Sequence, residues 1–143
     1  GQNAGKDDLI RSGNQHSALD RKTILVVEDI SSNYLLISAM LSKHYNLLHA
    51  VNGEQAVAMV KEYKIDLLLM DMKMPVMDGL TATAEIRKFD TNIPIVALTA
   101  HAFESDKVAA LKSGCNDYLV KPVDKARLMS VLRKYCHPST LVL

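Results

Sequence analysis

Short hydrophobic runs alternate with longer amphipathic segments from about residue 22 to residue 135. The runs are rich in leucine and β-branched residues and predict strands over residues 23–27, 47–51, 67–70, 93–98 and 117–120. The intervening segments carry apolar residues at helical spacing and predict helices over residues 34–41, 54–63, 80–88, 104–113 and 125–135. Nearly continuous apolar strands are typical of a sheet covered on both faces. Five strands alternating with five helices therefore predict an α/β fold with a parallel sheet.

Polar residues and glycines mark where the helices are expected to begin and end. The residues at 31–33 offer N-cap chemistry for the first helix, and Asp124 does so for the last. Asn52 and Gly53 form a turn signal. Gly114 suits the position just after the fourth helix, where a left-handed backbone is common.

The composition fits one globular domain without a global attraction to anionic partners. The chain has 143 residues, 48% of them hydrophobic, and a net charge of +1. We interpret residues 1–21 as a disordered linker or expression tail, 22–135 as the domain, and 136–143 as a C-terminal tail. Basic residues form no run, and the apolar stretches are too short to span a bilayer, so we expect neither direct nucleic-acid binding nor a membrane segment.

The two cysteines, Cys115 and Cys136, have neither the spacing of a metal site nor that of a disulfide framework. We expect two free thiols, which fits a reducing compartment such as the cytoplasm.

The candidate chemistry lies where the predicted strands end. The first strand is followed by Glu28 and Asp29, the third by Asp71, the fourth by Thr99 and the fifth by Lys121. In an open parallel sheet the carboxyl ends of the strands share one edge, where ligands bind. Each residue alone has a simpler explanation, such as a helix cap or a solvated surface charge. Their joint occurrence predicts one site.

Three crowded carboxylates repel one another and favour a hard cation, Mg²⁺ or Mn²⁺, that prefers oxygen ligands. The ammonium of Lys121 and the hydroxyl of Thr99 suit a phosphoryl group. A carboxylate can attack phosphorus and form an acyl phosphate. The pattern thus favours metal-assisted phosphoryl transfer to Asp71.

Four segments make the chain resemble the response regulator receiver family over about residues 22–135. They are Val27-Glu28-Asp29, Met70–Gly79 (MDMKMPVMDG), Ala97–Ala100 (ALTA) and Tyr118–Pro122 (YLVKP). The resemblance implies a flavodoxin-like (βα)5 fold, with a five-stranded parallel sheet in the order 2-1-3-4-5 and helices on both faces.

The resemblance also assigns roles to individual residues. Asp71 is similar to the phosphoacceptor nucleophile, assisted by Lys121 and Thr99. Glu28, Asp29, Asp71 and the backbone carbonyl of Lys73 resemble the metal ligands.

Thr99 and Tyr118 resemble the switch pair of the family. Phosphorylation would draw Thr99 inward, let the ring of Tyr118 follow, and change the surface formed by the fourth helix, fifth strand and fifth helix. A static role for Tyr118 as a half-buried core residue stays open. The resemblance further implies a cis peptide at Lys121-Pro122. Lys73 and His101 would lie beside the site and tune the acyl-phosphate lifetime.

The wider context is expected to be a phosphorelay. The linker before the first strand, and the run from Ala97 to Ala102, favour the C-terminal receiver of a hybrid sensor histidine kinase with a membrane-anchored parent. The donor would be a histidine kinase or phosphotransfer domain. The receiver would catalyse its own phosphorylation and dephosphorylation, as a monomer or a phosphorylation-linked dimer. A DNA-binding regulator and a single-domain regulator stay open.

Two other classes of protein fit the sequence less well. A haloacid dehalogenase-type phosphatase would need a second aspartate two residues after the nucleophile, where this chain has Lys73. A protein-interaction module that is not phosphorylated would be signalled by loss of the acid pair, Asp71 or Lys121, all of which are present. None of the five histidines has the features of a phosphodonor: His44 and His49 belong to the region of the second strand, and His16 and His137 to the tails.

Overall fold

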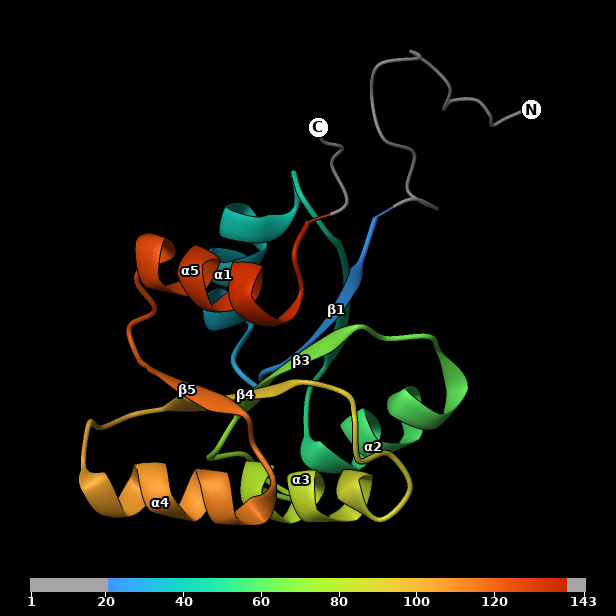
Figure 1. Ribbon diagram of the computed structural model, residues 1–143, viewed down its shortest axis with the longest axis vertical. Coiled ribbons are helices and arrows are strands. Elements are labelled where there is room, and N and C mark those ends of the chain that lie inside the picture. The colour runs from blue at the N-terminus through green and yellow to red at the C-terminus, as the bar shows by residue number, and fades with distance from the viewer. Residues whose placement is uncertain (1–20, 139–143) are drawn as a thin grey trace.

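The computed structural model describes residues 21–138, which form one parallel sheet covered by helices on both faces (Figure 1). The strands are β1 (Thr23–Val27), β2 (Asn46–Ala50), β3 (Leu67–Asp71), β4 (Ile95–Thr99) and β5 (Asp117–Val120). Their order is β2-β1-β3-β4-β5, and every neighbouring pair is parallel. The predicted α/β fold and strand order are confirmed. The tails at residues 1–20 and 139–143 lie outside the described residues.

Five helices follow the strands in turn. They are α1 (Ser31–Leu41), α2 (Gly53–Glu62), α3 (Gly79–Arg87), α4 (Glu104–Ser113) and α5 (Lys125–Tyr135). Helices α1 and α5 cover one face of the sheet, and α2, α3 and α4 cover the other (Figure 1). None of the helices within residues 21–138 is long and apolar enough to cross a membrane.

Alternation along the strands divides the core into two halves. In β1, Ile24 and Val26 belong to the core on the side of α1 and α5, whereas Leu25 and Val27 belong to the core under α2 and α3. All four side chains are fully buried. A strand with two buried faces reads as a continuous apolar run, which explains why the sequence pattern identified the sheet.

Local side-chain bonds set the element boundaries. Asp78 and Asp124 cap α3 and α5 by accepting backbone N–H groups, and Gly114 ends α4 with a left-handed φ of 118°. The expected capping of α1 by residues 31–33 is wrong: these residues lie inside the helix, and Ile30 occupies the N-cap position without a side-chain cap. The Glu28 carboxylate instead accepts the N–H of Ile30 at 3.2 Å.

Two predicted strands are shifted by one or two residues. The Asp90 carboxylate accepts the N–H groups of Asn92 and Ile93, and this turn delays the start of β4 to Ile95. At the end of β2, the N–H of Val51 donates to the Gln55 side chain instead of to the sheet. Side-chain bonds of this kind are not visible to a hydrophobicity pattern.

Candidate functional site

The carboxyl ends of β1, β3, β4 and β5 bring the predicted polar residues to one edge of the sheet. Val27 pairs with Met70, so Glu28 and Asp71 follow directly from adjacent strands. Asp71 pairs with Leu98 in β4, and Thr99 pairs with Val120 in β5. Strand register therefore places Glu28, Asp71, Thr99 and Lys121 next to one another in space.

Three carboxylates meet at the centre of this edge. Glu28, Asp29 and Asp71 each offer an oxygen, and these oxygens lie within 4.8 Å of one another. Glu28 is fully buried and Asp71 is only 4% exposed, whereas Asp29 is half-buried and opens the cluster toward solvent. An all-oxygen donor set with one solvent-facing side matches the preference of Mg²⁺, which retains several waters.

Lys121 bridges the two buried acids. Its ammonium lies 2.9 Å from Glu28 Oε1 and 3.0 Å from Asp71 Oδ2. The lysine precedes a cis peptide to Pro122, as predicted, and its own N–H donates to the Thr99 carbonyl at 2.7 Å. The Lys121 side chain thus reaches across the edge from the end of β5 to the end of β1.

Burial and the shared ammonium determine how the acids titrate. Burial raises the pKa of Asp71 to about 6, although the bonds from Lys121 and Lys73 act in the opposite direction. Burial also acts to raise the pKa of Glu28, but the bonds from Lys121 and Ile30 outweigh it and leave that pKa below its ordinary value. Burial alone would lower the pKa of Lys121, whereas the two carboxylates raise it. One ammonium thus pairs with two of the three clustered acids, and the site favours a further cation.

The loop after β3 wraps tightly around Asp71. The N–H of Lys73 donates to Asp71 Oδ1 at 3.2 Å, and the N–H of Gly79 donates to the Met72 carbonyl at 3.2 Å. A Cβ on Gly79 would lie 2.3 Å from the Asp71 carbonyl oxygen, so only glycine fits there. Sequence reasoning placed Gly79 in a motif but did not identify this contact.

Thr99 and Tyr118 each contact a group outside the carboxylate cluster. The Thr99 hydroxyl donates to the His101 carbonyl at 3.0 Å. Tyr118 is half-buried, and the ammonium of Lys107 in α4 lies 4.9 Å from the centre of its ring. Neither of these two contacts involves the acid cluster.

Lys73 and His101 flank a cavity of about 570 Å³ between the loops that follow β3 and β4, and Thr99 also lines it. Both residues are exposed, as predicted for positions beside the site. Through Thr99 the cavity reaches the end of β4.

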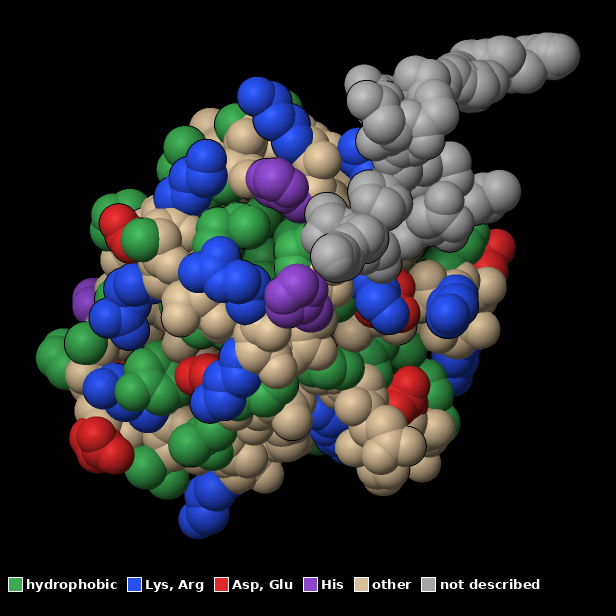
Figure 2. Space-filling view, turned by 45° about the horizontal axis from the view of Figure 1, so that its top comes forward, with side chains coloured by type: hydrophobic (Ala, Val, Ile, Leu, Met, Phe, Trp, Pro, Cys, Tyr) green, Lys and Arg blue, Asp and Glu red, His purple; other side chains and the backbone are tan. Residues whose placement is uncertain are grey.

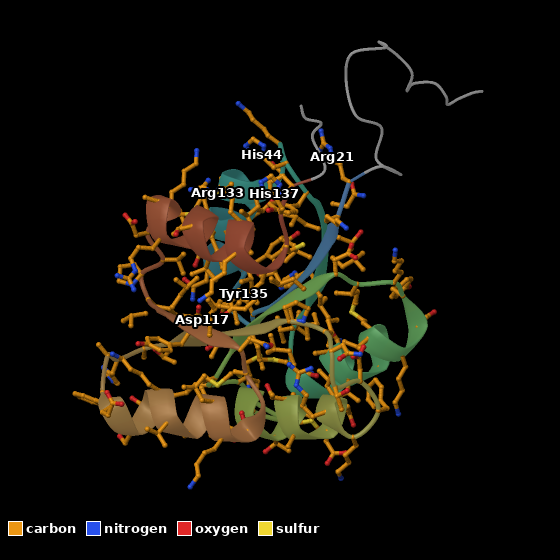
Figure 3. The ribbon with its side chains drawn as sticks, viewed as in Figure 1. Arg21, His44, Asp117, Arg133, Tyr135 and His137 are labelled. Atoms are coloured by element: carbon orange, nitrogen blue, oxygen red, sulfur yellow. The ribbon has the colours of Figure 1, made fainter. Side chains whose placement is uncertain are left out.

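The other histidines that the structure describes lie in two different places. His44 precedes β2 and His137 follows α5, so both lie with Arg21 at the amino-terminal edge of the sheet, opposite the acids (Figure 3). On the face drawn in Figure 2, basic side chains are dispersed among hydrophobic and neutral ones. His49, in contrast, lies within β2, inside the strand predicted at residues 47–51; its ring reaches the backbone carbonyl of Glu28, a contact that sequence reasoning missed.

Comparisons with known proteins agree with this geometry. The family model described as "Response regulator receiver domain" matches residues 24–133. The chain is 41% identical over 119 residues to hybrid signal transduction histidine kinase M of Dictyostelium discoideum, covering 78% of this chain and 5% of that protein. It is 38% identical over 113 residues to transcription factor SKN7 of Saccharomyces cerevisiae, covering 78% of this chain and 18% of that protein. The chain thus spans a small part of these relatives.

Two solved structures are similar in both sequence and fold. The receiver domain of sensor histidine kinase PA1611 from Pseudomonas aeruginosa PAO1, with a magnesium ion coordinated in its active site cleft, is 40% identical with a TM-score of 0.75, covering 80% of this chain and 96% of that one. The Saccharomyces cerevisiae complex of phosphotransfer protein Ypd1 with the receiver domain of Ssk1 gives 36% identity and a TM-score of 0.77, covering 80% and 88%.

Proposed function

This chain belongs to the response regulator receiver domain family, and from that premise we propose that it accepts a phosphoryl group from a phosphohistidine on Asp71 with the help of Mg²⁺. One observation carries the proposal: Asp71 lies beside two other acids and within 3.0 Å of the Lys121 ammonium. The same ion pair supports a role for Lys121 in neutralising the phosphoryl group.

The transfer is a displacement at phosphorus. The bond between phosphorus and the donor imidazole nitrogen breaks, the nitrogen keeps the electron pair, and a carboxylate oxygen of Asp71 forms the new bond. Lys121, now paired with Asp71 and Glu28, binds a phosphoryl oxygen. Its positive charge offsets the negative charge on the three equatorial oxygens, so positioning and charge neutralisation provide the catalysis.

Glu28, Asp29, Asp71 and the Lys73 carbonyl would hold the divalent cation. When bound, Mg²⁺ supplies positive charge between the acid cluster and the phosphoryl oxygens. The donor set consists only of oxygens, which supports Mg²⁺ and leaves Mn²⁺ as the alternative.

The signal leaves the site through Thr99 and Tyr118. Phosphorylation attracts the Thr99 hydroxyl away from the His101 carbonyl. The ring of Tyr118 then leaves its contact with Lys107 and moves toward the vacated space. The changed surface of α4, β5 and α5 serves as the output, either in the monomer or in a phosphorylation-linked dimer.

The phosphodonor docks on the exposed apolar face at the start of α1. Ile30, Leu35 and Leu36 are 51%, 63% and 49% exposed. A groove lined in part by Glu28, Leu36 and Lys121 joins this face to the site. The solved complex of a related receiver with the phosphotransfer protein Ypd1 supports a donor or acceptor of the same kind here.

We place residues 22–135 as the receiver unit of a hybrid histidine kinase, on the cytoplasmic side of a membrane-anchored parent protein. The similarity to a hybrid kinase supports this context, whereas the similarity to SKN7 supports the alternative, a DNA-binding regulator. A kinase core encoded upstream would favour the first, and a DNA-binding domain in the same open reading frame would favour the second.

Phosphoacceptor activity is tested with Mg²⁺ and acetyl phosphate or beryllofluoride. With acetyl phosphate, mass spectrometry should detect the phosphoryl adduct in wild type but not in Asp71→Asn, and EDTA should abolish it. Asp78→Asn is the matched control, because asparagine preserves the α3 cap that Asp78 provides. Equal labelling of wild type and Asp71→Asn would overturn the assignment, and no labelling of a folded wild type would favour a non-phosphorylated interaction module.

A further inference from the structure

The backbone of Glu28 is held on both sides by β2. Its N–H donates to the Ala50 carbonyl at 2.9 Å, and its carbonyl oxygen lies 2.8 Å from His49 Nε2. A carbonyl oxygen only accepts hydrogen bonds, so Nε2 carries the hydrogen in this contact. A side chain from within β2 thus extends the pairing of β1 with β2 to Glu28, the residue that follows β1.

This contact orients both members of the acid pair. The Glu28 carbonyl belongs to the peptide unit that joins Glu28 to Asp29, and a peptide unit is planar. Fixing its oxygen therefore fixes the plane from which the Asp29 side chain departs. The Glu28 carboxylate, already bound to Lys121 and the Ile30 N–H, keeps its direction as well.

The imidazole is itself held in place. Tyr34 of α1 stacks on the His49 ring, with centroids 3.8 Å apart and an angle of 5° between the planes. Both residues are half-buried, and Tyr34 packs against the core under α1 and α5. The stack leaves the ring little freedom to rotate away from the Glu28 carbonyl.

We propose that His49 is a positioning residue for the metal-binding acids, with Tyr34 holding its ring. The inference rests on the proposed Mg²⁺ site. It assigns the positioning role to β2, the outermost strand of the sheet, which contributes no metal ligand. Hydrogen-bond partners of metal ligands typically change metal affinity by about 10- to 100-fold when they are removed. His49 acts through a backbone carbonyl, so we expect an effect at the lower end, roughly 10-fold.

Two substitutions separate the hydrogen bond from the stacking. His49→Phe keeps an aromatic ring on Tyr34 but removes the donor, and it should weaken Mg²⁺ binding roughly 10-fold in calorimetric titration. His49→Gln places an amide N–H donor the same number of bonds from Cβ and should restore most of the affinity. Tyr34→Phe keeps the stack and should bind Mg²⁺ as wild type does.

A second measurement uses unmodified protein. In ¹⁵N-histidine NMR spectra of the metal-free domain, the neutral His49 ring should be the Nε2–H tautomer with a slowly exchanging proton. The opposite tautomer would overturn the proposal even if His49→Phe fails to fold.

The outcomes distinguish this inference from the proposed function. If wild type binds no Mg²⁺ and is not labelled on Asp71, the proposed function fails. If wild type binds Mg²⁺ and folded His49→Phe binds it equally well, only the positioning role fails. If His49→Phe and His49→Gln are weakened alike, the hydrogen bond is not the cause, and the role assigned to it is refuted.

Discussion

Replacing Asp71 by asparagine is expected to stabilise the metal-free domain at neutral pH. The carboxyl is nearly fully buried, and burial raises its pKa to about 6 from the ordinary value of 3.8. The folded state therefore binds this proton more tightly than the unfolded chain does. The stability that comes from the protonated form is fully present below pH 3.8 and is lost as the pH rises through 6.

The size of the effect follows from the two pKa values. A pKa that is higher by roughly two units corresponds to about 3 kcal/mol of lost stability once Asp71 is ionised. Asparagine carries no charge, so Asp71→Asn should regain an amount on the order of 1–3 kcal/mol near pH 7.5, and about half as much near pH 5. The amide can still accept the N–H of Lys73.

Urea unfolding in EDTA measures this difference at the two pH values. Glu62→Gln is the matched control, because it removes one carboxylate from an exposed position at the end of α2. Excess Mg²⁺ should reverse the order of stability, because the cation binds the ionised wild-type site more tightly. The reasoning is refuted if Asp71→Asn is no more stable than wild type in EDTA near pH 7.5, or if its advantage does not shrink toward pH 5.

Two further substitutions test the site as a packed unit. Lys121→Met removes the ammonium that Asp71 shares and should lower the free energy of unfolding in urea by about 3 kcal/mol. Lys88→Met breaks an exposed ion pair and should lower it by less than about 1 kcal/mol. Equal losses of stability in the two variants would contradict the structure. Gly79→Ala should lower stability by roughly 2 kcal/mol or more, because the added Cβ would collide with the Asp71 carbonyl oxygen. Thr81→Ala, on the exposed side of α3, should be nearly neutral. If Gly79→Ala is also neutral, the loop relaxes freely and the predicted collision is refuted.

Most of the fold could be predicted from the sequence because its signals are local. Both faces of β1 and β3 are buried, so each strand appears as an uninterrupted apolar run ending at an acid. Cap residues such as Asp124 also act within one helical turn. The start of α1 was predicted less well, because the group that binds the Ile30 N–H is the Glu28 carboxylate, which was assigned only to the metal site.

The candidate site likewise combines features that the sequence predicts with features that depend on tertiary structure. That Glu28, Asp29, Asp71 and Lys121 share one sheet edge follows from sequence, because parallel strands end on the same side. The pairing of Lys121 with Glu28 joins residues 93 positions apart, and it depends on strand register. No periodicity or propensity encodes such a distance.

Local sequence patterns were sufficient to identify the alternation of strands and helices, the polar residue at the end of each functional strand, and the resemblance that names their roles. Tertiary structure alone decided that one ammonium serves two buried acids, that Thr99 faces the His101 carbonyl, and that His49 reaches the backbone of Glu28. The physical reason is the distance along the chain over which each kind of signal acts. Hydrophobic patterns report what each residue requires of its own strand or helix, whereas these contacts join separate elements, and only their packing brings the atoms within bonding distance.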